Sequence, residues 1–255
     1  LRVFSVLKKG MTHRSFAFCC GGNKYIMRIP GEGTEQLINR REEAEVYREI
    51  REQNICDEVI YIDAENGYKI TEYIQGARVC DPCAESDIRK CMEKLRNFHA
   101  LKLVTAHEFD IWKQIEFYES LWEGESSSYR DYFQTKESVL SLRPFTEKYA
   151  AQKVLTHIDA VPDNFLFVVD ENGKESIRMI DWEYAGMQDP HIDIAMFCIY
   201  SFYERAQVDH LIDLYFAEGC EKTLRIKIYC YIAACGLMWS NWCEYKRSMG
   251  VHFSA

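Results

Sequence analysis

The hydrophobic pattern of the chain changes near residue 75, and this change constrains the fold more than any other feature. Before it, five short segments with strand character (residues 2–7, 14–20, 24–29, 58–63 and 68–74) are separated by turn sequences such as Gly21-Gly22-Asn23. One helical segment, residues 34–52, follows the third of them, with Thr34 as its expected N-cap. The sequence therefore predicts a small lobe of five antiparallel strands and one helix at residues 1–74.

The rest of the chain, residues 75–255, is mainly helical in pattern. Helices are expected at residues 85–102, 110–122, 129–149, 191–205, 209–218 and 221–246, with short apolar strands at 154–157, 165–169 and 177–180. The fold class is therefore α+β, with two lobes that meet near residue 75. The longest strongly apolar run, residues 229–239, is far shorter than the roughly 20 residues of a membrane span, so no membrane insertion is expected.

Charge and cysteine content narrow the class of protein further. The chain has 31 Lys and Arg against 40 Asp and Glu, and no basic run, so we do not expect a nucleic-acid binder. Its 11 cysteines lie largely among apolar residues, and no signal-peptide pattern opens the chain, which favours free thiols in the reducing cytoplasm. Cys80 and Cys83 have the spacing of half a zinc site, but without a second such pair we interpret the spacing as coincidence.

The strongest chemical motif lies between two of the short strands. His157-Ile158-Asp159 follows the first strand, and Asn164 stands five residues after Asp159. Phosphoryl transfer to an alcohol needs a carboxylate that orients the hydroxyl and accepts its proton, and a neutral oxygen ligand for Mg²⁺ nearby. The alternative is a polar turn in which both side chains only cap backbone groups. The spacing alone leaves both interpretations open.

A second motif favours the chemical interpretation. Asp181 follows another apolar strand, 22 residues after Asp159 (181 − 159). A carboxylate that leaves a buried strand at this distance is placed to hold Mg²⁺ between phosphates. A single Asp at a strand end is often a capping residue, but the ordered combination of Asp159, Asn164 and Asp181 is specific.

The small lobe carries weaker signals. Gly10-Met11-Thr12 lies in the first hairpin, where a single glycine does not distinguish a phosphate-binding loop from an ordinary turn. Arg28 is a cation within an apolar strand, and Glu43 on the following helix could hold it in an ion pair, as a phosphate-binding cation requires. Composition alone favours a solvated charge at Arg28.

At this point the chain resembles the LicA-type bacterial choline kinases, within the choline/ethanolamine kinase and aminoglycoside phosphotransferase superfamily. The resemblance extends over nearly the whole chain. Besides the motifs above, it includes Gly33-Thr34-Glu35, Thr71-Glu72-Tyr73-Ile74, Asp189-Pro190 and Trp239-Ser240 with Trp242 and Tyr245-Lys246. Two departures are His13, where relatives commonly have Asn, and Arg28, where most kinases have Lys.

The resemblance implies a protein-kinase-like fold that uses ATP and Mg²⁺. It implies that Asp159 is the catalytic base and that Asn164 and Asp181 are metal ligands. It further implies a nucleotide site of six residues: Gly10, Thr12, Arg28, which would contact phosphate, Glu43, which would orient Arg28, and the hinge backbone of Glu72 and Ile74. Asp193 is equivalent to an acid that steadies the catalytic loop, although an N-cap role fits it as well.

The expected acceptor is choline, whose quaternary ammonium must be recognised by aromatic faces and diffuse negative charge. A suitable set surrounds the catalytic motifs in sequence, and with Asp159 it would form the substrate site: Glu183, Tyr184, Tyr200, Tyr203, Trp239, Trp242 and Tyr245. The tryptophans could instead be a buried core face. Ethanolamine, an aminoglycoside or another small alcohol is the alternative acceptor, and a non-catalytic quaternary-amine binding module is the alternative class. The sequence carries no signal for an oligomeric state.

Overall fold

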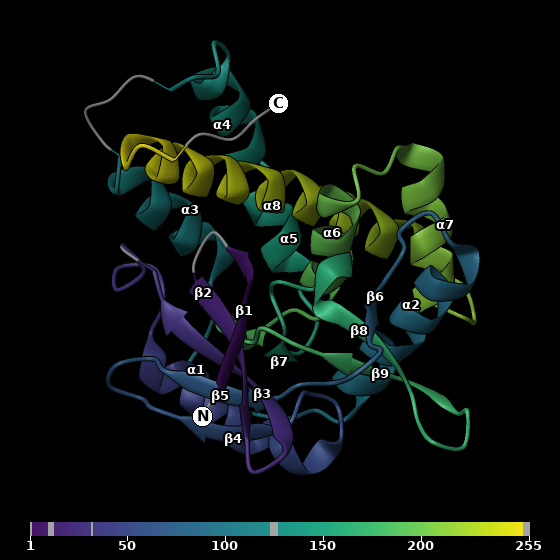
Figure 1. Cartoon of the computed structure of the whole chain (residues 1–255). Helices are drawn as coiled ribbons and strands as arrows, with labels where there is room; N and C mark the ends of the chain where they lie inside the picture. Colours follow the sequence, from purple (N-terminus) through teal and green to yellow (C-terminus); the bar gives the residue numbers. More distant parts are fainter. Residues whose placement is uncertain (1, 10–12, 32, 123–126, 252–255) are drawn as a thin grey trace.

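The computed structural model describes residues 2–9, 13–31, 33–122 and 127–251, which form a small sheet lobe and a larger helical lobe (Figure 1). The small lobe is one antiparallel sheet in the order β1-β2-β3-β5-β4. Its strands are β1 (Arg2–Lys9), β2 (His13–Cys20), β3 (Asn23–Pro30), β4 (Val59–Ile62) and β5 (Lys69–Glu72). Helix α1 (Arg40–Ile50) and a 3₁₀ turn (Arg51–Gln53) connect β3 to β4. The predicted fold class is confirmed.

The helix of the small lobe begins six residues later than expected, so the prediction of Thr34 as its N-cap was wrong. Asn39 is the N-cap, and its side chain accepts hydrogen bonds from the backbone of Arg41 and Glu42. Thr34 instead starts a tight turn, because its carbonyl accepts from the amides of Leu37 and Ile38. Those two residues pack into the core of the large lobe, and this contact outweighs their helical pattern.

The large lobe contains seven helices among the described residues, with strands between them. The helices are α2 (Glu85–Ala100), α3 (Ile111–Ser120), α4 (Tyr132–Leu140), α5 (Arg143–Lys148), α6 (His191–Tyr200), α7 (Arg205–Tyr215) and α8 (Lys222–Ser248). The strands are β6 (Arg78–Val79), β7 (Val154–Thr156), β8 (Phe165–Val169), β9 (Glu175–Met179) and β10 (Gly186–Gln188). Strand β6 pairs with β8 and β10 with β7, and neither β6 nor β10 was predicted.

The single helix expected at residues 129–149 is two helices, α4 and α5. Pro144 lies in the first turn of α5. Proline lacks a backbone N–H and its ring clashes with the carbonyl four residues earlier, so a continuous helix through this position is unfavourable. The chain therefore turns between Leu140 and Arg143.

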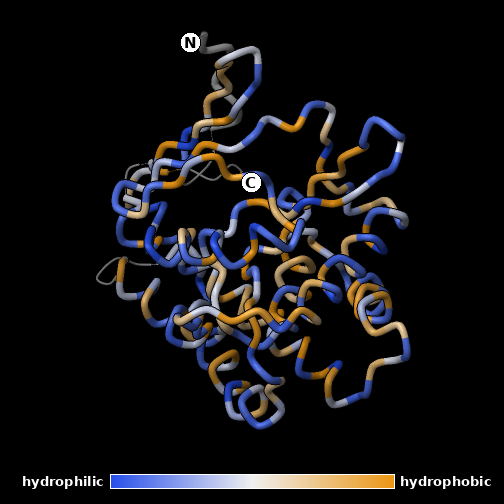
Figure 2. The backbone as a smooth tube through the Cα atoms, turned by 90° about the horizontal axis from the view of Figure 1, so that it is seen from below, coloured by the Kyte–Doolittle hydropathy of each residue, from blue (hydrophilic) through white to orange (hydrophobic). Residues whose placement is uncertain are grey.

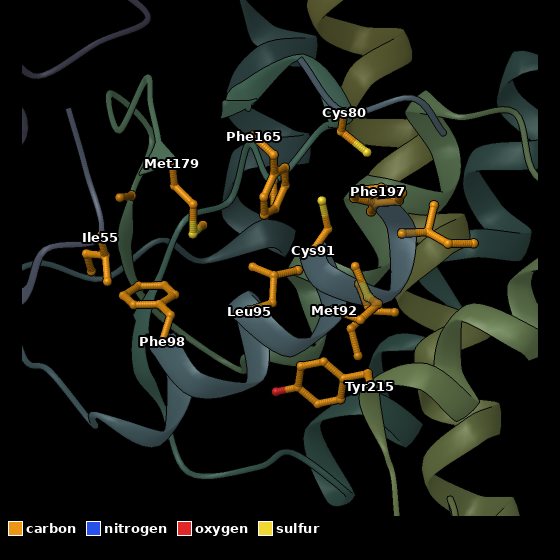
Figure 3. Packing of buried hydrophobic residues seen from close by; sticks show 14 of the residues in the cluster. Ile55, Cys80, Cys91, Met92, Leu95, Phe98, Phe165, Met179, Phe197 and Tyr215 are labelled. Carbon is orange, nitrogen blue, oxygen red and sulfur yellow. The ribbon is translucent and has the colours of Figure 1, made fainter. Parts of the chain in front are cut away.

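The core of the large lobe forms where α2 packs against β8, β9 and α6 (Figure 3). Leu95, Phe165 and Phe197 are fully buried there, and the Cys80 and Cys91 side chains lie among them. All 11 cysteines are free, and six of them are buried. Cys83 is exposed, so it does not share the buried environment of Cys80. The lobe boundary predicted near residue 75 falls between β5, which ends at Glu72, and β6, which begins at Arg78.

Hydrophobic and hydrophilic residues are interspersed over most of the backbone (Figure 2). Within the described residues, no helix has the length and apolar character that crossing a bilayer would require.

Candidate active site

The loop after β7 is held by Asp193 of α6. Its carboxylate accepts hydrogen bonds from the backbone N–H of His157 (3.0 Å) and of Ile158 (2.8 Å), and it contacts His99 Nε2 at 2.9 Å. Ile158 has a positive φ of 68°, which is rare for a β-branched residue and must be imposed by its surroundings. The N-cap of α6 is Pro190, so Asp193 does not cap this helix and instead fixes the loop that carries Asp159.

Asp159 and Asn164 are brought together by the 3₁₀ turn Pro162–Asn164. Asn164 Nδ2 donates to the Asp159 carbonyl at 2.8 Å and to Asp159 Oδ2 at 3.0 Å. The amide thereby orients the carboxylate. Because both hydrogen bonds use Nδ2, the Asn164 Oδ1 is the atom left to face a cation.

Asp159 is an unusually basic carboxyl. Burial raises its pKa to about 8, and the negative charges of Asp181 and Glu183 act in the same direction, while the hydrogen bond from Asn164 opposes them. General-base catalysis is most efficient when the pKa of the base lies near the working pH. The environment of Asp159 therefore suits a group that accepts a proton near neutrality.

Arg28 connects the two lobes. Its guanidinium donates to Glu43 of α1, to Asp181 Oδ1 at 2.7 Å and, more weakly, to Glu183 Oε2 at 3.4 Å. The ion pair with Glu43 expected from the sequence is present and buried. Glu43 is also 3.6 Å from the ammonium of Lys69. Arg28 is thus not a solvated surface charge, because it lies at the centre of a buried network of carboxylates.

The donor set around Asp181 fits a divalent cation. Asp181 has a positive φ of 67°, which directs it out of the strand that precedes it. One ligand atom each of His13, Asp181 and Glu183 lie within 4.8 Å of one another. Carboxylate and amide oxygens are the ligands that Mg²⁺ prefers, which matches Asp181 and the Oδ1 of Asn164. Burial, followed by the charge of Arg28, lowers the pKa of His13 to about 3, so this imidazole is neutral at pH 7.

A cavity of about 350 Å³ opens beside this network. Its wall includes Arg28, the hinge residues Glu72 and Ile74, and Asp181, so four predicted site residues share one space. Gly10 and Thr12, the other two predicted nucleotide contacts apart from Glu43, lie outside the described residues. Glu43 does not line this cavity, but it accepts a hydrogen bond from Arg28, which does. The cavity wall thus combines the hinge segment with cationic and anionic side chains.

A second, narrow cavity of about 10 Å³, enough for one water molecule, meets Asp159 on the large-lobe side. Asp159 is the one charged group in its wall. The other lining residues are aromatic or apolar: Phe109, Tyr118, Ile158, Tyr184, Met196, Met238, Trp239 and Trp242. Trp239 and Trp242 lie with their ring planes at 78°, edge to face. Aromatic rings therefore lie in the same cavity wall as the carboxylate that would contact the acceptor hydroxyl.

Four residues predicted for the substrate site do not line this aromatic cavity. The Tyr245 hydroxyl donates instead toward the Gly33 carbonyl and Gln36 of the small lobe, because it lies six residues beyond Trp239 and faces another side of α8. Glu183 turns to Arg28 and His13. Tyr200 donates to Asp163, and Tyr203 to the Pro82 carbonyl, both beyond the cavity wall.

Several cavity residues escaped the sequence analysis. Phe109 precedes α3 and Tyr118 lies on it, while Met196 and Met238 lie on α6 and α8. None belongs to a motif, and each reads as an ordinary core residue in a helical pattern. Only the packing of α3 and α6 against α8 assembles them (Figure 1).

Comparisons with known proteins identify the family of the chain. A family model described as choline/ethanolamine kinase matches residues 4–215. Protein LicA of Haemophilus influenzae is 26% identical over 260 residues, covering 96% of this chain and 74% of that protein. The crystal structure of choline kinase LicA from Streptococcus pneumoniae is 27% identical with a TM-score of 0.83, covering all of this chain and 89% of that one.

Two further structures extend the comparison. The crystal structure of LicA in complex with AMP is 28% identical with a TM-score of 0.83, covering 99% of this chain and 86% of that one. The structure of a thermostable mutant of aminoglycoside phosphotransferase APH(4)-Ia is 16% identical with a TM-score of 0.62, covering 98% of this chain and 96% of that one, and shows a similarity of fold alone. The family match spans most of the chain: the chain belongs to the choline/ethanolamine kinase family and is a kinase that acts on a small alcohol.

Proposed function

We propose that the protein transfers the γ-phosphoryl group of ATP to the hydroxyl of choline, giving phosphocholine and ADP. The observation that carries the proposal is the aromatic wall beside Asp159, whose cavity of about 10 Å³ admits one water as it stands, so that choline would bind there with the lining side chains moved apart. A quaternary ammonium offers no N–H donor, so cation–π contacts with Trp239, Trp242 and Tyr184 are the favourable way to bind it. A cavity of this composition offers little to the many hydroxyl and amine groups of an aminoglycoside.

The proposed roles follow from the contacts. Asp159 orients the hydroxyl and accepts its proton as transfer proceeds, since this reaction depends mainly on positioning and electrostatic stabilisation. Arg28, held by Glu43, contacts phosphate, and the hinge backbone of Glu72 and Ile74 holds the base. Asn164 and Asp181 would hold Mg²⁺, which when bound would offset negative charge on the phosphates. The nucleotide then lies mainly against residues 1–74 and the acceptor against residues 75–255.

We also propose that the protein acts in the cytoplasm, since its free cysteines are typical of a reducing compartment.

The acceptor is tested by ADP release with choline, ethanolamine and kanamycin. We expect the highest kcat/KM with choline, because the cavity wall offers aromatic faces and a single carboxylate. A higher kcat/KM with ethanolamine or kanamycin would identify that compound, rather than choline, as the acceptor. Absence of ADP release with all three would support the binding-module alternative.

Replacing Trp239 with Ala should raise the KM for choline by about 2- to 30-fold, as expected for the loss of one cation–π contact of roughly 0.5–2 kcal/mol. The KM for ATP should change little, because Trp239 does not line the nucleotide cavity. Steady-state kinetics with each substrate varied in turn measures both values. Trp112 is a matched control, since it is buried beside α8 but outside the cavity wall, and its substitution should not raise the KM for choline selectively.

A further inference from the structure

Asp57 is a buried acid that the catalytic roles above do not use. It lies just before β4 and lines the nucleotide cavity together with Glu72 and Ile74. Its exposed fraction is 8%, and its Oδ1 has no hydrogen-bond partner among the described residues. A buried carboxylate oxygen without a donor is unfavourable, so its presence in a binding cavity points to a donor on the ligand.

The backbone places Asp57 next to the hinge residues that line this cavity. Val59 pairs with Thr71, and the Glu72 amide donates to the Glu58 carbonyl, so the next residue back along the chain, Asp57, lies beside the hinge. On its other side, the Met179 amide donates to the Ile55 carbonyl at 2.7 Å. Asp57 is therefore between the hinge and the segment that leads to Asp181. This position is near the hinge residues, where the proposed function places the adenine base.

The neighbouring Lys69 does not satisfy the Oδ1 atom of Asp57. Lys69 also lines the cavity, but its ammonium donates to the Tyr47 hydroxyl at 2.5 Å and lies 3.6 Å from Glu43. Burial raises the pKa of Asp57, and the charge of Lys69 opposes this shift without overcoming it. The protein surroundings thus leave Asp57 in need of a further donor.

We propose that Asp57 accepts a hydrogen bond from the exocyclic C6 amine of the purine and so selects a 6-aminopurine nucleotide. The inference rests on the proposed function, in which the hinge backbone holds adenine. One N–H of the amine can donate to the hinge carbonyl of Glu72. The second N–H is then directed toward the part of the cavity wall that includes Asp57. A 6-oxopurine presents a carbonyl oxygen there, and two facing acceptors repel each other.

Direct binding titration tests this assignment with three nucleotides: ATP, purine riboside triphosphate, which lacks the C6 group, and inosine triphosphate, which carries a C6 oxygen. Wild type should bind ATP most tightly. Asp57→Ala should weaken ATP binding by about 10- to 100-fold, the range for a hydrogen bond to a charged group. Binding of the purine riboside nucleotide should change by less than about 3-fold. Glu58→Ala, an exposed neighbour outside this cavity wall, should leave all three affinities unchanged.

Asp57→Asn provides a second variant of nearly identical volume. Its amide can donate as well as accept, so the affinity for inosine triphosphate relative to ATP should rise by about 10-fold or more. Equal weakening of ATP and purine riboside triphosphate in Asp57→Ala would overturn the proposal, as would a wild type without preference for ATP. These titrations contain no choline. Failure of choline as acceptor would therefore leave their result unaffected, and loss of base selectivity would leave the acceptor assignment unaffected.

Discussion

Asp159→Asn is expected to lower kcat by about 10²- to 10⁴-fold, the usual contribution of a general base. The asparagine cannot accept the hydroxyl proton, but it keeps the oxygen that receives the hydrogen bond from Asn164. The loop should therefore retain its geometry, since Asp193 fixes it from the other side. Turnover by ADP release, together with the thermal unfolding midpoint, measures the two effects separately.

Asp163→Asn is the matched control, because Asp163 lies in the same loop and contacts Tyr200 rather than the aromatic cavity. It should retain a kcat within a few-fold of wild type. A wild-type kcat for Asp159→Asn would remove Asp159 from the mechanism and with it the role proposed for the cavity.

Asp189→Asn is expected to reduce the free energy of unfolding by about 3–5 kcal/mol, as when a buried ion pair loses one partner. Asp189 accepts hydrogen bonds from Lys227 at 2.6 Å, from the Tyr231 hydroxyl at 3.1 Å and from the Ala151 amide at 2.8 Å. The Lys227 side chain is fully buried, so the substitution leaves an uncompensated charge between β10 and α8. Urea unfolding at pH 7 measures the difference.

The stability that Asp189 contributes is expected to depend on pH. Burial works against the charge on Asp189, but His191 and Lys227 together outweigh it and hold the pKa of the carboxyl well below its usual range. A depressed pKa contributes stability above the unfolded-state value of about 3.9 and loses it as the pH falls through the folded value. The gap between wild type and Asp189→Asn should thus narrow below about pH 4. Asp213→Asn, an exposed acid on α7, should show little destabilisation at pH 7 and no comparable narrowing.

The sequence was most informative where periodic pattern and local chemistry agree. The five strands of the small lobe and the long helix expected at residues 221–246 are present in the structure. The sequence also singled out Asp159 and Asn164, and the two side chains are hydrogen bonded. The sequence was least informative where contacts between residues far apart along the chain determine the structure. Leu37 and Ile38 continue a helical pattern but pack into the other lobe, and strands as short as β6 have no period to detect.

The aromatic cavity illustrates the same limit. Trp239 and Trp242 were found because they recur on one helix, whereas Phe109 and Tyr118 come from a different part of the chain and carry no motif. Tyr245 continued the spacing, yet the helical rotation directs it to Gly33 of the small lobe. Spacing along one helix identifies candidates, but the partner helices decide which of them face a shared space.

The left-handed backbone at Ile158 has a bearing on engineering. Glycine there would relieve a conformational cost of about 1–3 kcal/mol, but it would also delete a buried isoleucine side chain, which costs about 2–5 kcal/mol, so the position is a poor one for thermostabilisation. The isoleucine side chain also lines the aromatic cavity, so the same change would remove part of the wall of the proposed acceptor site. The strained backbone and the buried side chain are therefore retained together at this residue, and a stabilised variant should be sought elsewhere in the chain.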